Sequence, residues 1–390
     1  MSSFIVSAAR TPIGAFMGSL SDLTAPRLGA IAIKAALERA ALAPDMISEV
    51  IMGNVLTAAV GQAPARQASI FAGLPTSVPC MTINKVCGSG LKSVMLADQA
   101  IRCGDADVVV AGGQESMTNA PYALAKARGG YKYGNGEIID TLLHDGLFDV
   151  YNKYAMGVAA ELCASDCNIT REMQDAFTIA SYQKALDAQK NGFFVDEIAS
   201  VIVAGRKGDV VVDTDEEPSK VNFEKIPTLK PAFTKDGTIT AANASTINDG
   251  AAAVVVASEL ALTTHNLVPM ARIVAQASFA QDPAWFTTAP VDAIRRVVSK
   301  AGLTLDDIDL FEINEAFAVV TMAAQDKLGI PMEKINVHGG AVALGHPIGA
   351  SGARLLTTLL YALKRRQKKY GLVTLCIGGG EASAMIIERL

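Results

Sequence analysis

One short stretch, Asn84-Lys85-Val86-Cys87-Gly88-Ser89-Gly90, combines a cysteine with glycines that would leave its sulfur open to a ligand. We expect a buried strand at 80–83 before it and a helix over the Ala- and Leu-rich residues 91–103 after it. The unpaired N–H groups and the dipole of a helix start favour a thiolate over a thiol. A free cysteine is commonly a buried core residue, so this stretch alone leaves both a nucleophile and a core thiol open.

Three stretches near the other end of the chain hold further reactive residue types. Gly345-His346-Pro347-Ile348-Gly349-Ala350-Ser351-Gly352 places one of only four histidines in a glycine-rich turn, where functional groups concentrate. The run Cys376-Ile377-Gly378-Gly379-Gly380 ends an apolar segment, and its glycines free N–H groups that could hold an oxyanion. Asn314 follows a predicted strand at 310–313. Each stretch also has a structural explanation, namely a structural histidine, a core thiol and a helix N-cap.

Together these residues suit acyl transfer through a thioester. One thiolate would carry the acyl group, with His346 as its base. A second thiol could exchange a proton with a carbon acid next to a thioester carbonyl. A carbanion that attacks an acyl-enzyme needs two oxyanion pockets, one for each carbonyl. The amides of Cys87 and Gly378 could form one pocket, and His346 with Asn314 could form the other.

The elements that must position these residues form two similar halves. Residues 108–116 and 373–383 are both buried strands that run into glycine-rich turns followed by Glu-Ser or Glu-Ala-Ser. This echo indicates two copies of one α/β unit, in which ligand sites lie beyond the strand ends. The predicted strands are 4–8, 50–52, 80–83, 108–113, 253–257, 310–313, 372–376 and 382–387. The predicted helices are 26–42, 65–72, 91–103, 171–191, 291–301, 316–328 and 352–364.

Residues 118–248 differ from both halves because polar and aromatic residues increase and the regular strand–helix alternation stops. The stretch is too long for a connecting loop. We interpret it as an inserted domain over the sheet, after which Asn248-Asp249-Gly250 is expected to cap a short helix. The predicted organisation is therefore an N-terminal half at 1–117 completed by 249–270, the insertion at 118–248, and a C-terminal half at 271–390.

Composition excludes several functional classes. The 390 residues carry 34 basic and 39 acidic side chains, so no basic surplus indicates a nucleic-acid partner. Six scattered cysteines suit free thiols in a reducing compartment. No apolar run reaches membrane-spanning length without glycine or charge, and the N-terminus has no targeting pattern. We therefore expect a cytoplasmic protein without a membrane or nucleic-acid partner.

The motifs at 84–90, 314–318, 345–349 and 376–380, in this order and spacing, resemble the thiolase family, in particular its biosynthetic acetyl-CoA C-acetyltransferase branch. The resemblance extends from Ala9-Arg10-Thr11-Pro12-Ile13-Gly14 to the last of these motifs. It implies an α/β fold with a five-layered α-β-α-β-α core, an inserted loop domain that binds coenzyme A, and a homotetramer built as a dimer of dimers. It also implies Claisen condensation of two acetyl-CoA to acetoacetyl-CoA and coenzyme A, and the reverse thiolysis, with no required cofactor.

The resemblance implies a role for each reactive residue. Cys87 would be the acylated nucleophile and His346 its activator. Cys376 would deprotonate the second acetyl-CoA. Asn314 would hold a water in the first oxyanion pocket, and the amides of Cys87 and Gly378 would form the second.

The resemblance also implies a set of coenzyme A contacts. Lys220 and Lys225 would lie near the nucleotide, although Lys220 replaces an arginine that stacks on adenine in relatives, and lysine cannot stack as a planar fork. Ala155 replaces a histidine that is frequent in relatives, which removes a polar contact. The remaining implied contacts, mostly along the pantetheine, are Met156, Tyr182, Phe233, Ala244, Ser245 and Phe317.

The segment 240–245 resembles the potassium-activated mitochondrial branch. There, a potassium ion is held by the residues that match Tyr182 and the carbonyls of Ala241, Ala242, Ala244 and Val342. Carbonyl oxygens suit a hard cation, but close packing explains the small residues equally well. Trp285-Phe286 also resembles this branch, which accepts 2-methyl-branched substrates.

Three other functions remain as alternatives. The first is a degradative 3-ketoacyl-CoA thiolase of broader specificity. A decarboxylating ketoacyl-synthase relative would lack a second catalytic cysteine, so Cys376 argues against it. A non-catalytic acyl-CoA- or lipid-binding relative would tolerate loss of the reactive residues, which are all present.

Overall fold

The computed structural model describes residues 2–206 and 208–390 and is organised around one ten-stranded sheet. The strand order is β14-β15-β16-β13-β1-β12-β5-β3-β4, with β2 paired to β12. Its strands are β1 (Ser3–Arg10), β2 (Gly14–Ala15), β3 (Glu49–Gly53), β4 (Cys80–Ile83), β5 (Val108–Ser116), β12 (Asn248–Ser258), β13 (Ala271–Ala280), β14 (Leu310–Ile313), β15 (Tyr370–Ile377) and β16 (Glu381–Arg389).

The sheet consists of two halves that meet at a narrow seam. Strands β1 and β13 pair through only two residue pairs, Phe4 with Arg272 and Ile5 with Ala271. In the N-terminal half β4, β3 and β5 run parallel, and β12 and β1 follow antiparallel. In the C-terminal half β14 and β15 run parallel, and β16 and β13 follow antiparallel. The two halves thus repeat one strand pattern, as the sequence echo predicts.

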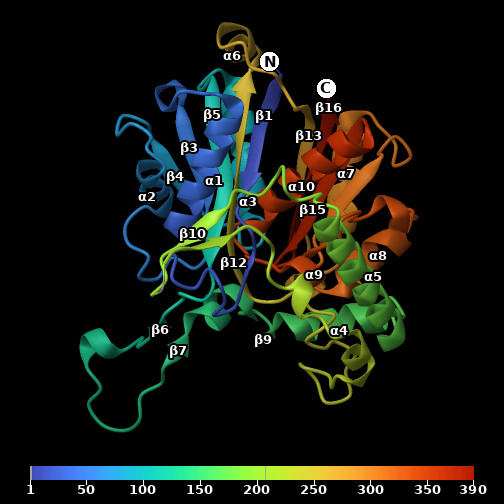
Figure 1. The fold of residues 1–390 in the computed structure, drawn as a ribbon. Helices are drawn as coiled ribbons and strands as arrows, with labels where there is room; N and C mark the ends of the chain where they lie inside the picture. Colours follow the sequence, from blue (N-terminus) through green and yellow to red (C-terminus); the bar gives the residue numbers. More distant parts are fainter. Residues whose placement is uncertain (1, 207) are drawn as a thin grey trace.

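Helices form three layers around the two sheet halves (Figure 1). Helices α1 (Ala25–Ala40) and α2 (Pro64–Phe71) cover the outer face of the N-terminal half. Helix α7 (Ala289–Ala301), with α8 (Ala318–Leu328) beside it, covers the outer face of the C-terminal half.

Helices α3 (Ser89–Cys103) and α10 (Ser351–Arg366) pack on each other between the halves. Because α10 is enclosed on all sides, every residue from Ser351 to Leu363 is buried. The layer order α-β-α-β-α is the predicted one.

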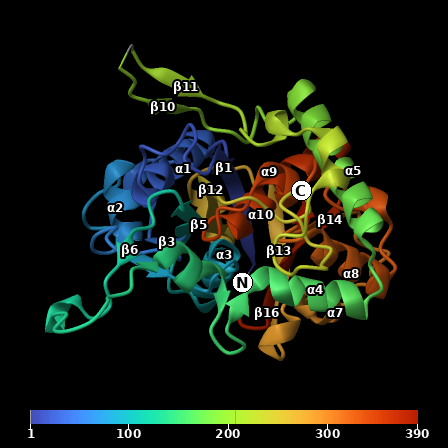
Figure 2. The same ribbon diagram turned by 90° about the horizontal axis from the view of Figure 1, so that it is seen from below.

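The segment 118–248 connects β5 to β12 and adds no described strand to the large sheet. Figure 1 and Figure 2 show its β6–β7 excursion projecting from the body, and Figure 2 shows the β10–β11 hairpin projecting elsewhere. Helix α5 packs against α8 and α9, and α4 packs against α8. Thr170 caps α5 by accepting from Met173 N at 3.3 Å, as predicted. The elements are β6 (Tyr122–Ala123), β7 (Ile139–Asp140), β8 (Phe148–Asp149), β9 (Tyr154–Ala155), α4 (Met156–Asp166), α5 (Arg171–Lys190), β10 (Val201–Val203) and β11 (Val210–Val212).

Two expectations about local structure are wrong, and one strand was not predicted. The strand at 80–83 is half-buried rather than buried, because β4 is the last strand of the sheet. Asn248-Asp249-Gly250 caps no helix: β12 already begins at Asn248, since its residues pair with β5 and β2. Strand β13 was not expected, because its alternating burial follows from pairing with β16, which is distant in sequence.

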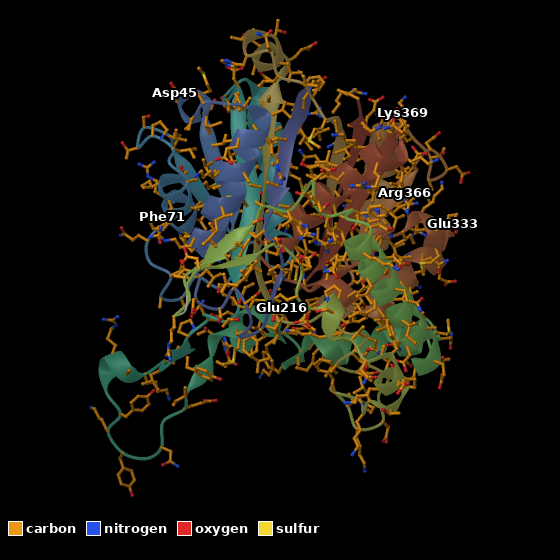
Figure 3. All side chains as sticks on the ribbon, in the orientation of Figure 1. Asp45, Phe71, Glu216, Glu333, Arg366 and Lys369 are labelled. Carbon is orange, nitrogen blue, oxygen red and sulfur yellow. The ribbon has the colours of Figure 1, made fainter. Side chains whose placement is uncertain are left out.

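The outside of the molecule is well supplied with charge. Figure 3 labels Asp45, Glu333, Arg366 and Lys369 around the periphery, with Glu216 in the inserted segment. Two further short helices complete the fold, α6 (Glu259–Thr264) and α9 (Ala341–Leu344). Within the described residues, no helix has the length and apolar character needed to cross a bilayer.

Candidate active site

Cys87 lies in a tight turn between β4 and α3. Val86 has φ +45°, which is unusual for a β-branched residue and costs about 1–3 kcal/mol. Asn84 Oδ1 accepts from Val86 N at 2.9 Å, and the Ser89 hydroxyl donates to Val86 O at 2.7 Å. These bonds hold the strained turn and present Cys87 at the start of α3.

The helix start does not make the Cys87 thiol acidic. Burial raises its pKa to about 11, although the backbone N–H groups of Gly378 and of Cys87 itself act to lower it. The expectation that the helix start favours a thiolate is therefore wrong, because loss of solvation outweighs the N–H donors. A neutral thiol with so high a pKa needs a base before it can act as a nucleophile.

His346 has the geometry of that base. Its Nδ1 lies 2.6 Å from Ser351 Oγ, and Ser351 Oγ lies 2.9 Å from Pro347 O. A carbonyl only accepts, so the single hydroxyl proton of Ser351 goes to Pro347, and Nδ1–H of His346 donates to Ser351. The Nε2 atom is then unprotonated. Burial, and then the charge of Arg354, lower the pKa of His346 to about 3, so the imidazole is neutral at physiological pH.

Asn314 lies beside the imidazole. Its Nδ2 is 3.5 Å from Nε2 of His346, and its backbone N donates to Thr374 O of β15 at 3.0 Å. Helix α8 begins only at Ala318, with Phe317 at its N-cap. The structure thereby excludes the N-cap explanation for Asn314.

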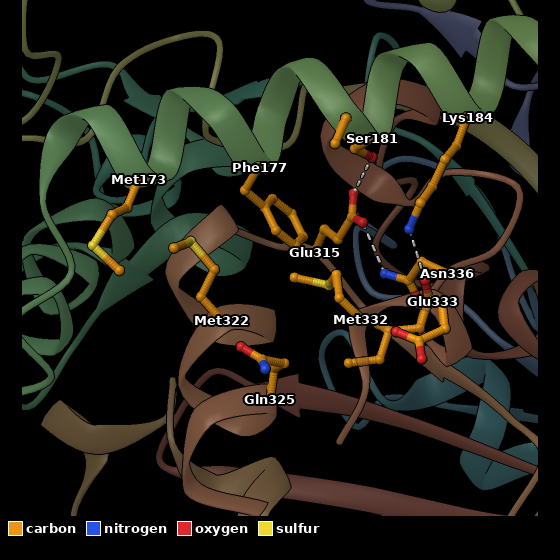
Figure 4. A pocket seen from close by; sticks show the side chains of 12 residues that line it. Met173, Phe177, Ser181, Lys184, Glu315, Met322, Gln325, Met332, Glu333 and Asn336 are labelled. Carbon is orange, nitrogen blue, oxygen red and sulfur yellow. Dashed lines mark hydrogen bonds between the residues drawn. The ribbon is translucent and has the colours of Figure 1, made fainter. Parts of the chain in front are cut away.

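Glu315 fixes the end of β14 behind Asn314. Figure 4 shows this buried carboxylate beside a cavity of about 300 Å³ between α5 and α8. Glu315 accepts from the Ser181 hydroxyl at 2.7 Å, Asn336 Nδ2 at 2.8 Å and Val342 N at 3.2 Å. All three bonds hold the backbone that carries the Asn314 amide.

Cys376 is the second thiol of the predicted set. It lies near the end of β15 with only 1% of its surface exposed. It does not line the pocket of about 560 Å³ that Cys87 and His346 line. Burial raises its pKa well above the ordinary value, and the neighbouring Cys87 sulfur raises it further. Of the two thiols, which lie close enough for their charges to interact, only Cys87 lines the pocket.

The larger pocket has a volume of about 560 Å³, and Cys87, His346 and Gly378 line it together. Lys225 lies outside the lining, on an exposed turn. Tyr182 is also outside it, packed edge-on against Phe223 with ring centroids 6.5 Å apart. The predicted contacts that do line it are Met156, Lys220, Phe233, Ala244, Ser245 and Phe317.

Aromatic rings form one wall of this pocket. Phe317 packs edge-on against Phe233 and Phe286, with centroids 6.0 and 6.4 Å apart. A Cβ on Gly157 would lie 2.3 Å from the Phe233 ring, so glycine at the start of α4 lets the ring close on the helix. Lys220 lies near the other end and forms an ion pair of 2.7 Å with Glu216.

Several apolar lining residues were not predicted. Phe16, Met117, Leu143, Leu147 and Ile247 come from loops and short turns, where no periodic pattern marks them. The signal available in the sequence was the presence of apolar side chains such as Leu143 and Leu147 in an otherwise polar segment.

The predicted potassium ligands have different surroundings. Ala241 and Ala244 line the pocket, whereas Tyr182 and Val342 share a separate buried cluster. Ala242, which lies between Ala241 and Ala244 in the sequence, is half-buried. Within the described part of the chain, no group of three or more His, Cys, Asp or Glu side chains could hold a metal ion.

Comparison with known proteins agrees with the fold. Residues 3–260 match the thiolase N-terminal domain, and residues 267–389 match the thiolase C-terminal domain. The acetyl-CoA acetyltransferase of Cupriavidus necator is 54% identical over 387 residues, covering 99% of this chain and 98% of the relative. Acetyl-CoA acetyltransferase 2 of Arabidopsis thaliana is 52% identical over 389 residues, covering 99% and 96%.

A solved structure extends the comparison to three dimensions. The Acat5 thiolase from Ascaris suum in complex with coenzyme A matches with a TM-score of 0.95 at 45% identity, and the match covers 100% of both chains. The predicted thiolase fold is confirmed by this match. Both family domains, in their order along the chain, and relatives above half identity over its full length lead to one conclusion: the chain belongs to the thiolase family.

Proposed function

We propose that the protein is an acyltransferase, an acetyl-CoA C-acetyltransferase. It condenses two acetyl-CoA into acetoacetyl-CoA and coenzyme A and catalyses the reverse thiolysis. One observation carries the proposal: Cys87, His346 and Gly378 line one pocket of about 560 Å³, and Asn314 lies 3.5 Å from the imidazole. The relatives at 52–54% identity that bear this activity in their names support it.

In thiolysis, Nε2 of His346 takes the proton of the Cys87 thiol, and the sulfur attacks the 3-keto carbon of acetoacetyl-CoA. The bond between C2 and C3 breaks, and its electron pair stays on C2 of the departing acetyl-CoA. The Cys376 thiol then protonates C2. These transfers leave acetyl-Cys87, a Cys376 thiolate and a protonated His346.

The second half restores all three groups. The Cys376 thiolate takes the proton of coenzyme A, whose sulfur attacks the acetyl group on Cys87. The Cys87 sulfur leaves and regains its proton from His346. The amides of Cys87 and Gly378, which act to lower the pKa of the Cys87 thiol, would hold one carbonyl oxygen. Asn314, through a water, and His346 would hold the other.

We propose that residues 118–248 form the coenzyme A-binding insertion, between halves at 1–117 with 249–270 and at 271–390. The support is that Met156, Lys220, Phe233, Ala244 and Ser245 all line the pocket from this segment. Phe317 would contact the pantetheine from the C-terminal half. Lys220 and Lys225 would meet the nucleotide, and Lys220 must then share its charge with Glu216.

We propose further that potassium binds the segment 240–245. The carbonyls of Ala241, Ala242 and Ala244 accept no hydrogen bond from any described residue, which leaves oxygens of the kind that a hard cation prefers. The bound ion would stiffen this wall of the pocket. Tyr182 and the Val342 carbonyl would complete its ligands.

We also propose a homotetramer built as a dimer of dimers. Strand β4 is the last strand of the sheet, and Met81 on it is 42% exposed beside the exposed Ile70 and Phe71 of α2. An apolar edge strand of this kind favours pairing with a second chain.

The cysteines form no disulfide among the described residues, which supports a cytoplasmic location.

A thiolysis assay tests the function. Acetoacetyl-CoA, 2-methylacetoacetyl-CoA and a long-chain 3-ketoacyl-CoA are compared at saturating coenzyme A, with potassium or sodium at equal ionic strength. We expect strong preference for the four-carbon chains, a higher rate with potassium, and no turnover by Cys87→Ser. Equal turnover of the long substrate would instead assign the protein to the degradative thiolases.

A further inference from the structure

Glu115, at the end of β5, is a fully buried carboxylate that the reaction steps above do not use. Its Oε1 accepts from Asn54 Nδ2 at 2.6 Å and Leu56 N at 3.2 Å. Its Oε2 accepts from Val55 N at 3.0 Å and Gly349 N at 2.9 Å. Glu115 therefore connects the loop at 54–56 to the turn that carries His346.

The four donors fit an ionised carboxylate and no other group of this size. All four are N–H groups, and a carboxylate has four lone-pair positions and no proton. A glutamine would turn its own N–H₂ toward two of the donors. No described cation forms an ion pair with Glu115, and burial raises its pKa to about 7 against the opposing effect of these bonds. A buried charge without an ion-pair partner is costly. A functional role of Glu115 would explain why the protein keeps this charge.

The His346 turn is built closely around this carboxylate. A Cβ on Gly349 would lie 2.6 Å from Glu115 Oε2, so only glycine fits there. A Cβ on Gly113 would lie 2.0 Å from Gly349 O, which shows how tightly the turn packs on β5. His346 comes from the C-terminal half of the chain and Glu115 from the N-terminal half. The bond to Gly349 is thus a polar contact that fixes the base relative to the half that carries Cys87.

We propose that Glu115 is a positioning residue for the acyl transfer, holding the His346 turn so that Nε2 faces the Cys87 thiol. The role rests on the proposed function, since it matters only if His346 activates Cys87. Glu115 touches neither the substrate nor the reacting atoms. It acts through the Gly349 amide and the loop at 54–56.

The test compares Glu115→Gln with Glu197→Gln, a control that alters a fully buried carboxylate bound to Arg10 and outside the pocket lining. Both variants are checked for folding by circular dichroism and thermal unfolding. At matched folded fraction, we expect the kcat of Glu115→Gln to fall about tenfold or more, since small displacements of a catalytic group are costly. The KM for coenzyme A should stay within about threefold, and Glu197→Gln should keep its kcat within about twofold.

Iodoacetamide labelling of Cys87 at pH 8 gives a second measurement that needs no substrate. The negative charge of Glu115 raises the Cys87 pKa, so a purely electrostatic role predicts faster labelling in Glu115→Gln. Loosened packing would also expose the sulfur and speed labelling. Displacement of the His346 base alone predicts slower labelling, which is the expected result. Labelling that is unchanged or faster, or a kcat that falls only with the folded fraction, would overturn the proposal.

The two measurements separate this proposal from the proposed function. If the unaltered protein lacks thiolase turnover, the function fails, but the labelling rate still shows whether Glu115 holds the base. If the unaltered protein turns over acetoacetyl-CoA and Glu115→Gln does so equally well, only the positioning role fails.

Discussion

The neutral pairing of Cys87 and His346 makes a sharp prediction about pH. With the thiol pKa near 11, only about one Cys87 in a thousand is ionised at pH 8 without help, and about one in a hundred at pH 9. A general base typically contributes roughly 10²–10⁴-fold. The unaltered enzyme should therefore owe most of its rate near neutral pH to Nε2 of His346.

Replacing His346 by asparagine removes the base and keeps a polar side chain of similar size. We expect acetylation of Cys87 to slow roughly 10²–10⁴-fold at pH 7.5. The residual rate should rise about tenfold per pH unit from pH 7 to 10, because the spontaneously formed thiolate is then the only nucleophile. The unaltered enzyme should show a much flatter profile over this range, since its imidazole, with a pKa near 3, is already deprotonated.

The assay is single-turnover acetylation of Cys87 by acetyl-CoA, followed by mass spectrometry of the intact protein across pH. His338→Asn is the matched control, because His338 is also buried with a pKa lowered to about 4 and lies outside the pocket lining. It should leave the profile unchanged. A His346→Asn rate that is independent of pH, or that levels off below pH 9, would refute the argument, because Cys87 would then ionise without a base.

Three further predictions use other contacts. Ser351→Ala removes the acceptor of Nδ1–H in His346 and should lower kcat about tenfold with little change in KM; steady-state kinetics of the double variant with His346→Asn should show no further loss. Gly157→Ala forces a Cβ to within 2.3 Å of the Phe233 ring and should raise the KM for coenzyme A severalfold with a smaller effect on kcat. An unchanged KM would contradict the assignment of Phe233 to the wall that binds coenzyme A. Arg10→Met leaves two buried carboxylates without their cation and should cost about 3–5 kcal/mol of stability in urea unfolding, whereas a loss below about 1 kcal/mol would mean that the site relaxes.

Elements with strong local signals are predictable from the sequence. The strand at 310–313 agrees with β14 in both bounds, and the helix from Arg171 to about Asn191 agrees with α5 within one residue. Short-range signals failed where long-range pairing decided the outcome. Asn248-Asp249-Gly250 has the composition of a turn, yet pairing with β5 and β2 makes it the start of a strand.

The residues of the candidate site also divide into those that the sequence identifies and those that only the fold reveals. Cys87, His346, Asn314 and Cys376 were identifiable because each lies in a distinctive motif at a strand end or helix start. The supporting residue Glu115 was visible only as part of the repeated strand and glycine-rich turn followed by Glu and Ser, since its role depends on donors more than fifty residues away.

By itself the sequence determined the reactive groups, their order along the chain, and the two-fold repetition of the α/β unit, because motif chemistry and apolar patterning are local properties. The tertiary structure alone decided how those groups behave. It removed enough solvent from the Cys87 thiol to reverse its expected acidity, oriented His346 through Ser351, and buried Cys376 outside the pocket lining but within electrostatic reach of Cys87. Solvation and proximity depend on which distant segments pack together, and the residues of any one stretch do not set them.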